Sequence, residues 1–315
     1  METPQNKAQW ERSVLERIAL EGLAEQRRRR RWGIFFKLLG FIYLGVILAY
    51  VVDWGRPTDK LGDASHTALV QLNGVIRAQG DASADSVISG LKAAFKDKGT
   101  KGVILRINSP GGSPVQSGII NDEIWRLRAL HPTIPLYVVV EDICASGGYY
   151  VASAADKIFV NKASIFGSIG VLMDGFGFTG TMEKLGVERR LLTAGKYKGF
   201  LDPFSPQNAQ QKAYAQEMLD EIHQQFIDAV RKGRGKRLKE TPDTFSGLMW
   251  TGAKSIQMGL ADGYGTVDSV ARDVIKASEV RDYTVKQNLA EKFAKQIGAQ
   301  VSGGVVNALT RMTLR

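Results

Sequence analysis

The sequence predicts an α/β domain, a parallel sheet covered by helices, that follows a single N-terminal membrane-spanning helix. Between residues 66 and 279, short apolar runs rich in β-branched residues alternate with stretches of helical periodicity, which is the pattern of βαβ units. Ahead of them lie the nearly uncharged residues 32–52. The overall composition, 44% hydrophobic and 23% charged, excludes a disordered chain and a multi-span membrane protein.

The N-terminal region predicts an uncleaved anchor. Residues 1–31 are polar and end in five consecutive arginines, Arg27 to Arg31, and residues 32–52 carry Lys37 as their only charge. At about 1.5 Å per residue, such a helix covers the roughly 30 Å hydrocarbon layer of a bilayer. Because positive residues stay on the cytoplasmic side, we expect the N-terminus inside and the rest of the chain outside. Residues 53–65 are read as a polar linker.

The following domain, residues 66–279, contains four clear strand candidates and four helix candidates. The strands are expected at 68–76, 102–107, 136–140 and 157–160, and the helices at 83–95, 115–130, 147–155 and 206–231. Residues 280–315 form a tail with a strand candidate at 283–285 and a helix from about Asn288. Parallel pairing with helices on the sheet follows from this alternation.

Two glycine-rich turns each follow an apolar strand. Ser146 and Gly147 are expected to begin a helix directly after the third strand. The Ser146 hydroxyl would then lie next to free backbone N–H groups of the helix N-terminus, and the glycine would let a substrate approach closely. These are the requirements of an acyl-transfer nucleophile with an oxyanion hole, although a helix N-cap serine explains the same pattern. The second turn contains Gly111 and Gly112, whose amides would complete such a hole. Cys144 is interpreted as a buried small hydrophobe.

A serine nucleophile needs a base, and histidine does not supply one in any visible pattern. His66, His131 and His223 are interpreted as surface residues, and their spacing supports no metal site, so no metal or cofactor is expected. A lysine serves as base if burial lowers an amine pKa from about 10.4 to about 7–8. Lys196 and Lys198 lie two residues apart, so spacing alone does not choose between them.

Five segments taken together carry a resemblance to a known family. They are NSPGG (108–112), ASGGYYVASAAD (145–156), FGSIGVLMDGFG (166–177), TAGKYKG (193–199) and TGAKSIQMGLADGYG (251–265). In this order the segments resemble the signal peptide peptidase A family, also called protease IV, in its single-copy short form. The resemblance implies a Clp and crotonase-like spiral of ββα units and a Ser-Lys dyad on the outer side of the membrane.

The resemblance also implies a role for each matching residue. Ser146 matches the nucleophile, Lys198 rather than Lys196 matches the general base, and Ser168 matches the hydroxyl that holds the lysine amine. The amides of Gly147 and of Gly111 or Gly112 would form the oxyanion hole. Substrate-lining positions are expected at Val115, Tyr149 and Tyr150.

The expected protein is a membrane-anchored serine endopeptidase of the bacterial inner membrane, with its catalytic domain on the outer side. Its substrates would be cleaved signal peptides and misfolded exported proteins, and the resemblance implies a homo-oligomeric ring such as an octamer. The alternatives are a crotonase-like acyl-CoA hydrolase or hydratase, and a catalytically silent membrane-tethered scaffold. The basic run 231–239 lacks interleaved aromatic residues, so no nucleic-acid partner is expected.

Overall fold

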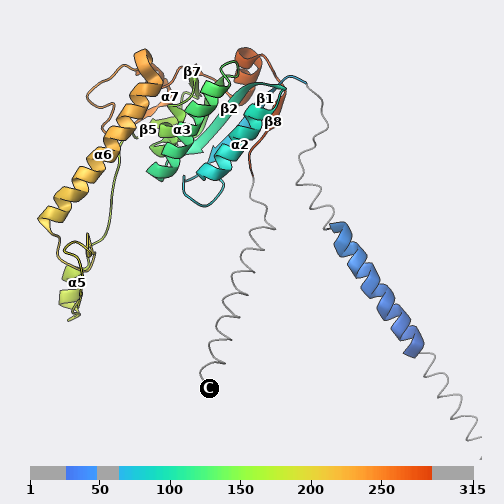
Figure 1. The fold of residues 1–315 in the computed structure, drawn as a ribbon, viewed down its shortest axis with the longest axis horizontal. Helices are drawn as coiled ribbons and strands as arrows, with labels where there is room; N and C mark the ends of the chain where they lie inside the picture. Colours follow the sequence, from blue (N-terminus) through green and yellow to red (C-terminus); the bar gives the residue numbers. More distant parts are fainter. Residues whose placement is uncertain (1–25, 48–63, 286–315) are drawn as a thin grey trace, which may run out of the picture. The chain divides into compact units, whose positions relative to one another are not determined.

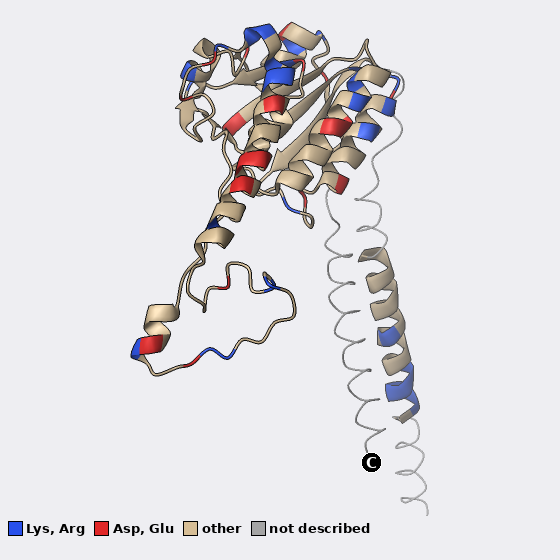
Figure 2. Ribbon diagram, turned by 60° about the vertical axis from the view of Figure 1, so that its left-hand side comes forward, with Lys and Arg blue, Asp and Glu red and all other residues tan. Residues whose placement is uncertain are grey.

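The computed structural model describes residues 26–47 and 64–285, which belong to two separate units (Figure 1). The first unit is a helix over residues 26–47. Its large apolar side chains, such as Phe41 at 73% exposure, face outward, and its arginines lie together at one end (Figure 2). Among the described residues, no helix has the combination of length and apolarity that crossing a membrane requires. Residues 48–52 of the expected anchor and the expected helix from Asn288 lie outside the described residues.

The second unit is built on an eight-stranded, mostly parallel sheet. The central strands run in the order β6-β5-β3-β2-β1-β8, and β4 and β7 extend the sheet beside β3. The bounds are β1 His66–Asn73, β2 Thr100–Ser109, β3 Leu136–Ala145, β4 Lys157–Val160, β5 Ile165–Gly167, β6 Met249–Thr251, β7 Gly263–Tyr264 and β8 Val280–Asp282. The one antiparallel pair among these strands joins β5 to β6. This sheet confirms the expected α/β class.

Strand β3 divides its edge between two neighbours. Its first half, Tyr137 to Val139, pairs with β4, and its second half, Ile143 to Ala145, pairs with β5. The strand therefore continues past the polar residues Glu141 and Asp142, although the sequence pattern predicts its end at Val140. As a result the carboxyl ends of β2, β3 and β5 lie next to one another.

The alternation of side chains along the strands builds a core on each face of the sheet. On β1, Ala68, Val70 and Leu72 belong to the larger core beneath the helices, whereas Leu69 points to the other face and packs with Val270 and Ala271. The second face is covered by α8 Val267–Ser269 and the π-helix η2 Val270–Ile275. Buried residues on both faces explain why the strands read as continuous apolar runs.

Three helices, α2 Ala84–Lys96, α3 Pro114–Leu130 and α4 Gly147–Ala152, pack beside the first three strands (Figure 1). Ser83 and Ser113 cap α2 and α3, because each hydroxyl accepts a hydrogen bond from a backbone N–H in the first turn. The expected helices at 83–95 and 115–130 are thus confirmed within one residue at each end, while α4 ends at Ala152, before the expected Ala155.

A long helix carries a segment away from the sheet. Helix α6, Ala209–Arg234, packs on α4 near its C-terminal end, and its other end extends outward (Figures 1 and 2). The segment of residues 171–208, which includes α5 Thr179–Lys184, lies around that outer end, and we call it the arm. Several large apolar side chains of the arm are exposed, among them Leu172, Phe176, Leu185 and Leu192.

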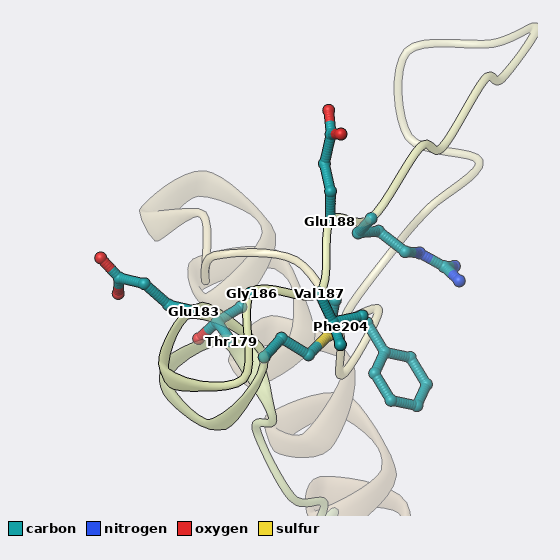
Figure 3. A pocket seen from close by; sticks show the side chains of 8 residues that line it. Thr179, Glu183, Gly186, Val187, Glu188 and Phe204 are labelled. Carbon is teal, nitrogen blue, oxygen red and sulfur yellow. The ribbon is translucent and has the colours of Figure 1, made fainter.

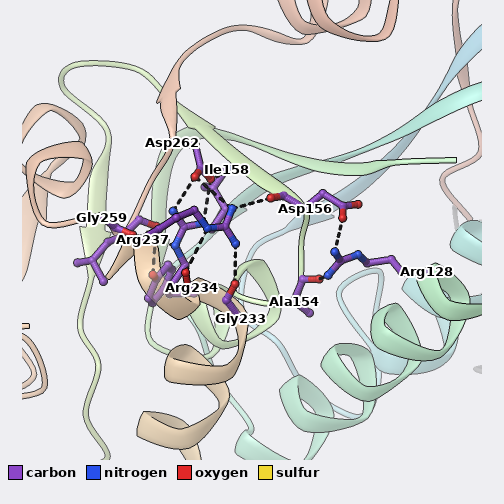
Figure 4. A network of polar contacts seen from close by, with 11 residues as sticks. Arg128, Ala154, Asp156, Ile158, Gly233, Arg234, Arg237, Gly259 and Asp262 are labelled. Carbon is purple, nitrogen blue, oxygen red and sulfur yellow. Dashed lines mark hydrogen bonds and ion pairs between the residues drawn. The ribbon is translucent and has the colours of Figure 1, made fainter. Parts of the chain in front are cut away.

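A buried ion-pair network fixes the inner end of α6 (Figure 4). The fully buried Arg234 side chain donates two 2.9 Å hydrogen bonds to the Asp262 carboxylate and a third to the Gly259 carbonyl oxygen. Asp262 also accepts from the Ile158 N–H and from Arg237. Arg231 pairs with Glu240. Three arginines of the basic run 231–239 are therefore held by acidic partners within the domain, and Arg234 among them is fully buried.

The short elements and one histidine differ from the sequence-based expectations. The 3₁₀ turn η1 Gly235–Arg237 and helix α7 Gly252–Gln257 follow α6, and strand β8 at 280–282 replaces the strand expected at 283–285.

His66 is not a surface residue, because it has 0% exposure. Its Nδ1 lies 3.0 Å from the Ala64 carbonyl oxygen and its Nε2 lies 2.9 Å from the Tyr283 hydroxyl, which itself donates to Asp97. The two ends of the sheet domain meet in this cluster.

Candidate active site

Ser146 lies at a strained elbow between β3 and α4. Its φ of +50° is unusual for a residue with a side chain, and such a conformation costs about 1–3 kcal/mol. The backbone is held there by two hydrogen bonds: Ser146 N–H donates to the Gly167 carbonyl oxygen at 2.8 Å, and Tyr150 N–H donates to the Ser146 carbonyl oxygen at 2.9 Å. The Ser146 hydroxyl makes no capping bond to α4. The N-cap interpretation of this serine therefore loses its main support.

The glycine turn after β2 packs directly against this elbow. A Cβ atom on Gly111 would lie 2.7 Å from both the Gly147 nitrogen and the Ser146 Cβ, so the turn approaches as closely as it does only because residue 111 is glycine. The turn is also fixed by the segment that follows β1, since Ile76 N–H donates to the Gly111 carbonyl oxygen and Ser113 N–H donates to the Ile76 carbonyl oxygen. Two turns that are separate in sequence thus form one surface.

The backbone amides at this junction differ in what they bind. The Gly111 N–H donates to Ser109 Oγ at 3.1 Å. The Gly112 and Gly147 N–H groups donate no hydrogen bond to any residue within the described part of the chain, 26–47 and 64–285. They lie close together, because a Cβ on Gly147 would be 3.3 Å from the Gly112 nitrogen. This pair of amides is available to an oxygen atom beside Ser146.

Ser168 follows β5 in the same way that Ser146 follows β3. Ala145 and Gly167 are paired with each other and are the last residues of β3 and β5. The residue that follows each strand has a positive φ, +50° for Ser146 and +51° for Ser168. Ser168 N–H donates to the Leu248 carbonyl oxygen at 2.8 Å, and Gly170 N–H donates to the Ser168 carbonyl oxygen at 2.9 Å. The structure therefore brings the Ser146 elbow and the Ser168 turn side by side.

Lys198 lies elsewhere in the chain, in a turn of the arm. Its backbone N–H donates to the Gly195 carbonyl oxygen at 3.1 Å, and the residue is exposed. Within the described residues, no hydrogen bond or ion pair joins its amine to Ser146 or Ser168. The alternative Lys196 amine lies 4.9 Å above the Tyr197 ring. Among residues 26–47 and 64–285, the structure thus brings together the serine and the two glycine amides, and it places Lys198 in the arm.

The three expected substrate-lining residues have different environments. Val115 is 67% exposed near the start of α3, just after the glycine turn. Tyr150 is half-buried, and its ring packs at a tilt against Phe226 of α6 with 5.0 Å between the ring centroids. Tyr149 has 0% exposure, and its hydroxyl donates to the Leu260 carbonyl oxygen. The expectation for Tyr149 does not fit this burial, because a core side chain cannot line an open groove.

Two further residues contribute to the surroundings of the elbow. Cys144 is fully buried, as expected, and burial raises the pKa of its thiol, so it is not a competing nucleophile. His223 of α6 is half-buried, and its Nε2 lies 3.1 Å from the carbonyl oxygen of Ile169, the residue after Ser168. The sequence pattern gives no signal for this contact, because the two residues are 54 positions apart and His223 sits in a polar helix.

A shallow pocket of the arm lies apart from these residues. It has a volume of about 320 Å³ and is formed by α5 and the following loop, with Thr179, Val187 and Phe204 among its lining residues (Figure 3). The Arg189 guanidinium lies over the Phe204 ring at 5.4 Å. None of the expected catalytic residues lines this pocket, so we place the candidate site at the Ser146 elbow.

Comparisons with known proteins cover the region of this candidate site. The model of "Peptidase family S49" matches residues 128–281, which include Ser146, Ser168 and Lys198. The chain is 44% identical over 209 residues to a Brucella melitensis protein named "Na(+)/H(+) antiporter NhaA", covering 65% of this chain but only 28% of that protein. A solved structure of a mutant of the 1510-N membrane-bound stomatin-specific protease has 14% identity and a TM-score of 0.39, and the match covers 70% of this chain and 97% of that chain.

One relative of similar length decides the family. The "Putative signal peptide peptidase SppA" of Enterococcus faecium is 31% identical over 232 residues, which cover 70% of this chain and 67% of that protein. Identity at this level over two thirds of the relative, together with the matching family model, shows that the chain belongs to peptidase family S49.

Proposed function

We propose that this chain is a membrane-anchored serine endopeptidase in which Ser146 is the nucleophile and Lys198 the general base. The observation that carries the proposal is the Ser146 elbow: an uncapped hydroxyl on a strained turn, next to two unpaired amides of Gly112 and Gly147. Unpaired N–H groups at such a turn are suited to hold the oxyanion of a tetrahedral intermediate. Gly112 is preferred to Gly111 for this role because the Gly111 amide is already bonded to Ser109.

The proposed reaction proceeds in two stages. A neutral lysine amine takes the Ser146 proton while Oγ bonds to the peptide carbonyl carbon, and the oxyanion forms at the two amides. The C–N bond then breaks, the lysine ammonium gives its proton to the leaving amine, and an acyl-enzyme remains. In the second stage the lysine takes a proton from water while the hydroxyl attacks the ester carbon. The bond between that carbon and Ser146 Oγ then breaks, the lysine ammonium returns its proton to Oγ, and the acid is released. Ser168, at the neighbouring turn, would orient the amine.

The exposed apolar side chains of the arm support a site to which two copies of the chain contribute residues. Lys198 is exposed on the arm, and the arm carries apolar side chains that no described residue of this chain covers fully, with Leu192 at 97% and Leu172 at 80% exposure. Exposed apolar groups of this number mark an interaction surface. We therefore assign the lysine of each site to the arm of a neighbouring copy in a homo-oligomeric ring.

A mixing experiment tests this assignment. Ser146→Ala and Lys198→Ala variants, each inactive alone, are unfolded, combined in equal amounts and refolded together. If serine and lysine come from different copies, random assembly restores about a quarter of wild-type peptide cleavage, since each site draws its two residues independently. Lys196→Ala is the matched control and should keep full activity. No recovery in the mixture, with two assembled single variants, would contradict the shared site.

The nucleophile has a separate test. A serine-reactive fluorophosphonate should label the wild-type chain and leave Ser146→Ala unlabelled, while Cys144→Ala should label normally. Cleavage of a hydrophobic signal-peptide substrate, measured against hydrolysis of an acyl-CoA, distinguishes the peptidase from a crotonase-like enzyme. We expect peptide cleavage only.

The proposed substrate is supported by a relative and by the exposed Val115, and the proposed location is supported by the N-terminal charge pattern. The Enterococcus relative is named as a putative signal peptide peptidase, and cleaved signal peptides are apolar segments of the kind that exposed Val115 would contact. The arginines before the apolar residues 32–52 support an anchor in the bacterial inner membrane with the catalytic domain outside. Misfolded exported proteins are the second proposed substrate class. Protease protection in spheroplasts tests the topology.

A silent scaffold is the second candidate, and one observation favours it: the described chain brings no base to Ser146. It predicts that neither fluorophosphonate labelling nor peptide cleavage occurs in the assembled full-length protein. Labelling that is abolished by Ser146→Ala excludes it.

A further inference from the structure

Helix α6 contacts the Ser168 turn and helix α4 through neighbouring residues on one face. His223 contacts the Ile169 carbonyl oxygen at 3.1 Å, next to Ser168, and the Phe226 ring packs at a tilt against Tyr150 of α4, four residues after Ser146. His223 and Phe226 are three residues apart, so they lie on the same side of the helix. The element that carries the arm therefore also contacts the Ser168 turn and α4, the helix that follows the Ser146 elbow.

The proton on His223 can be assigned from this contact. A backbone carbonyl oxygen only accepts hydrogen bonds, so a 3.1 Å contact with Nε2 requires the hydrogen to be on Nε2. Ile169 itself is fixed, because its side chain has 0% exposure and lies in the larger core. The carbonyl group is thus a rigid acceptor on the domain body, and His223 is the donor on the helix.

His223 also occupies a special position along α6. Between Ala209 and Val230, it is the one residue whose side chain makes a hydrogen bond to the sheet domain among the described residues; the side-chain bonds of Gln216 and Gln224 stay within the helix. Closer to the C-terminal end the helix is held by Phe226, Val230 and the Arg234 network. Beyond His223 toward the N-terminal end, α6 carries the arm outward (Figure 1).

The Ser168 turn needs such external support. Ser168 has a positive φ of +51°, a conformation that persists only when its surroundings fix it. Leu248 fixes the turn on one side, through the hydrogen bond from Ser168 N–H. The bond from His223 fixes the peptide group between Ile169 and Gly170, whose N–H donates to the Ser168 carbonyl oxygen.

We propose that His223 is a positioning residue: its Nε2–H group holds the Ser168 turn against α6 and so fixes the turn whose hydroxyl is proposed to orient the lysine amine. The inference rests on the proposed function, because it assigns His223 a role in aligning the groups of that site. His223 does not touch the reacting atoms and acts through the Ser168 turn. Its loss should lower the rate of the chemical step and leave substrate binding largely unchanged.

The test compares variants that keep or remove the donor in the full-length protein. His223→Leu removes it, and His223→Asn has an amide that is too short to reach the same point. His223→Gln keeps an N–H donor close to the position of Nε2. We expect kcat for peptide cleavage to fall about tenfold in the first two, the factor that one ordinary hydrogen bond represents, with KM within about twofold. His223→Gln should recover most of the activity, and Gln224→Leu, on the exposed side, should match wild type.

A spectroscopic measurement keeps this inference separate from the proposed function. The chain has three histidines, so ¹⁵N-histidine labelling with His66 and His131 variants identifies the His223 signals. We expect the Nε2–H tautomer, and we expect the amide signals of residues 168–170 to move in His223→Leu but not in His223→Gln. These results hold even if the wild type cleaves no peptide, an outcome that would contradict the proposed function alone. The Nδ1–H tautomer, or equal behaviour of the Leu and Gln variants, would overturn the inference.

Discussion

Replacing Gly111 by alanine should disable the proposed site, because the added methyl group would collide with the Ser146 elbow. The new Cβ would lie 2.7 Å from the Gly147 nitrogen and from the Ser146 Cβ, and 2.9 Å from the Ala145 carbonyl oxygen. Ordinary contact begins at 3.4 Å, so the elbow has to retreat by up to 0.7 Å, the difference between 3.4 and 2.7 Å. The atoms concerned are backbone and Cβ atoms, which have no rotamer by which to move aside.

The displacement has two measurable consequences. A shift of this size at reacting groups costs roughly 10- to 100-fold in turnover, because a misplacement of about 1 Å is worth about 100-fold. Stability should fall by roughly 2–4 kcal/mol, since alanine is strained at the φ of +103° and the added methyl overpacks the turn. Urea unfolding and peptide cleavage, measured on the same preparation, give both quantities.

Gly118→Ala provides the matched control. Gly118 lies within α3, a few residues further along, and a Cβ there would meet nothing within 4 Å. In a helix interior this change should stabilise the chain by about 0.5–1 kcal/mol and leave cleavage unaltered. If Gly111→Ala were as stable and as active as wild type, the glycine turn would not pack against the Ser146 elbow in the working protein, and the proposed oxyanion site would be wrong.

Three further outcomes are expected. Arg234→Met should lower the free energy of unfolding, measured in urea at pH 7, by about 3 kcal/mol. This is the lower end of the range for breaking a buried ion pair, because the Asp262 carboxylate keeps two other hydrogen-bond donors. Unchanged stability would contradict the network. Burial and the hydrogen bond to Asp97 raise the pKa of Tyr283 from 10.0 to about 12. Its protonated form therefore stabilises the fold below pH 10 and this contribution is lost between pH 10 and about 12, a loss that thermal melts of Tyr283→Phe should not show. Iodoacetamide should modify Cys144 only after denaturation, because the thiol is fully buried; rapid modification of the native chain would refute that burial.

The parts of the fold that could be predicted from sequence are those in which burial itself sets the pattern. Strands β1 to β4 carry apolar runs because the sheet has a core on both faces, and α2 and α3 begin at serine caps that are visible in the sequence. Strands β5, β6 and β7 have two or three residues each, too few to show any alternation. They are strands only because a neighbour pairs with them, as β5 does with the second half of β3.

The candidate site likewise has one part that the local sequence predicts and one part that it does not. The Ser146 elbow follows directly from an apolar strand and a glycine pair, which are local features of the sequence. The contact between His223 and the Ser168 turn joins residues 54 positions apart, and no local pattern marks it. Tyr149 is expected near substrate because it follows Ser146 closely, but the short helix α4 turns its side chain into the core. Proximity in sequence is a poor guide to position once the chain enters this helix.

In the proposed site, the sheet domain holds the serine and the amides, and the arm carries the lysine. Ser146, Gly112 and Ser168 follow strands or turns that are hydrogen-bonded to one another, so their relative positions are set by the sheet and need no partner. The amine proposed as base sits on a segment that extends away from this sheet, and α6 is the element that joins the two parts. In the proposed assembly, a lone copy would carry a serine with two amides but no base, and would not cleave peptides. Desolvation of the lysine and completion of the site would then be one event, the docking of an apolar arm on the next copy, which confines proteolysis to assembled protein.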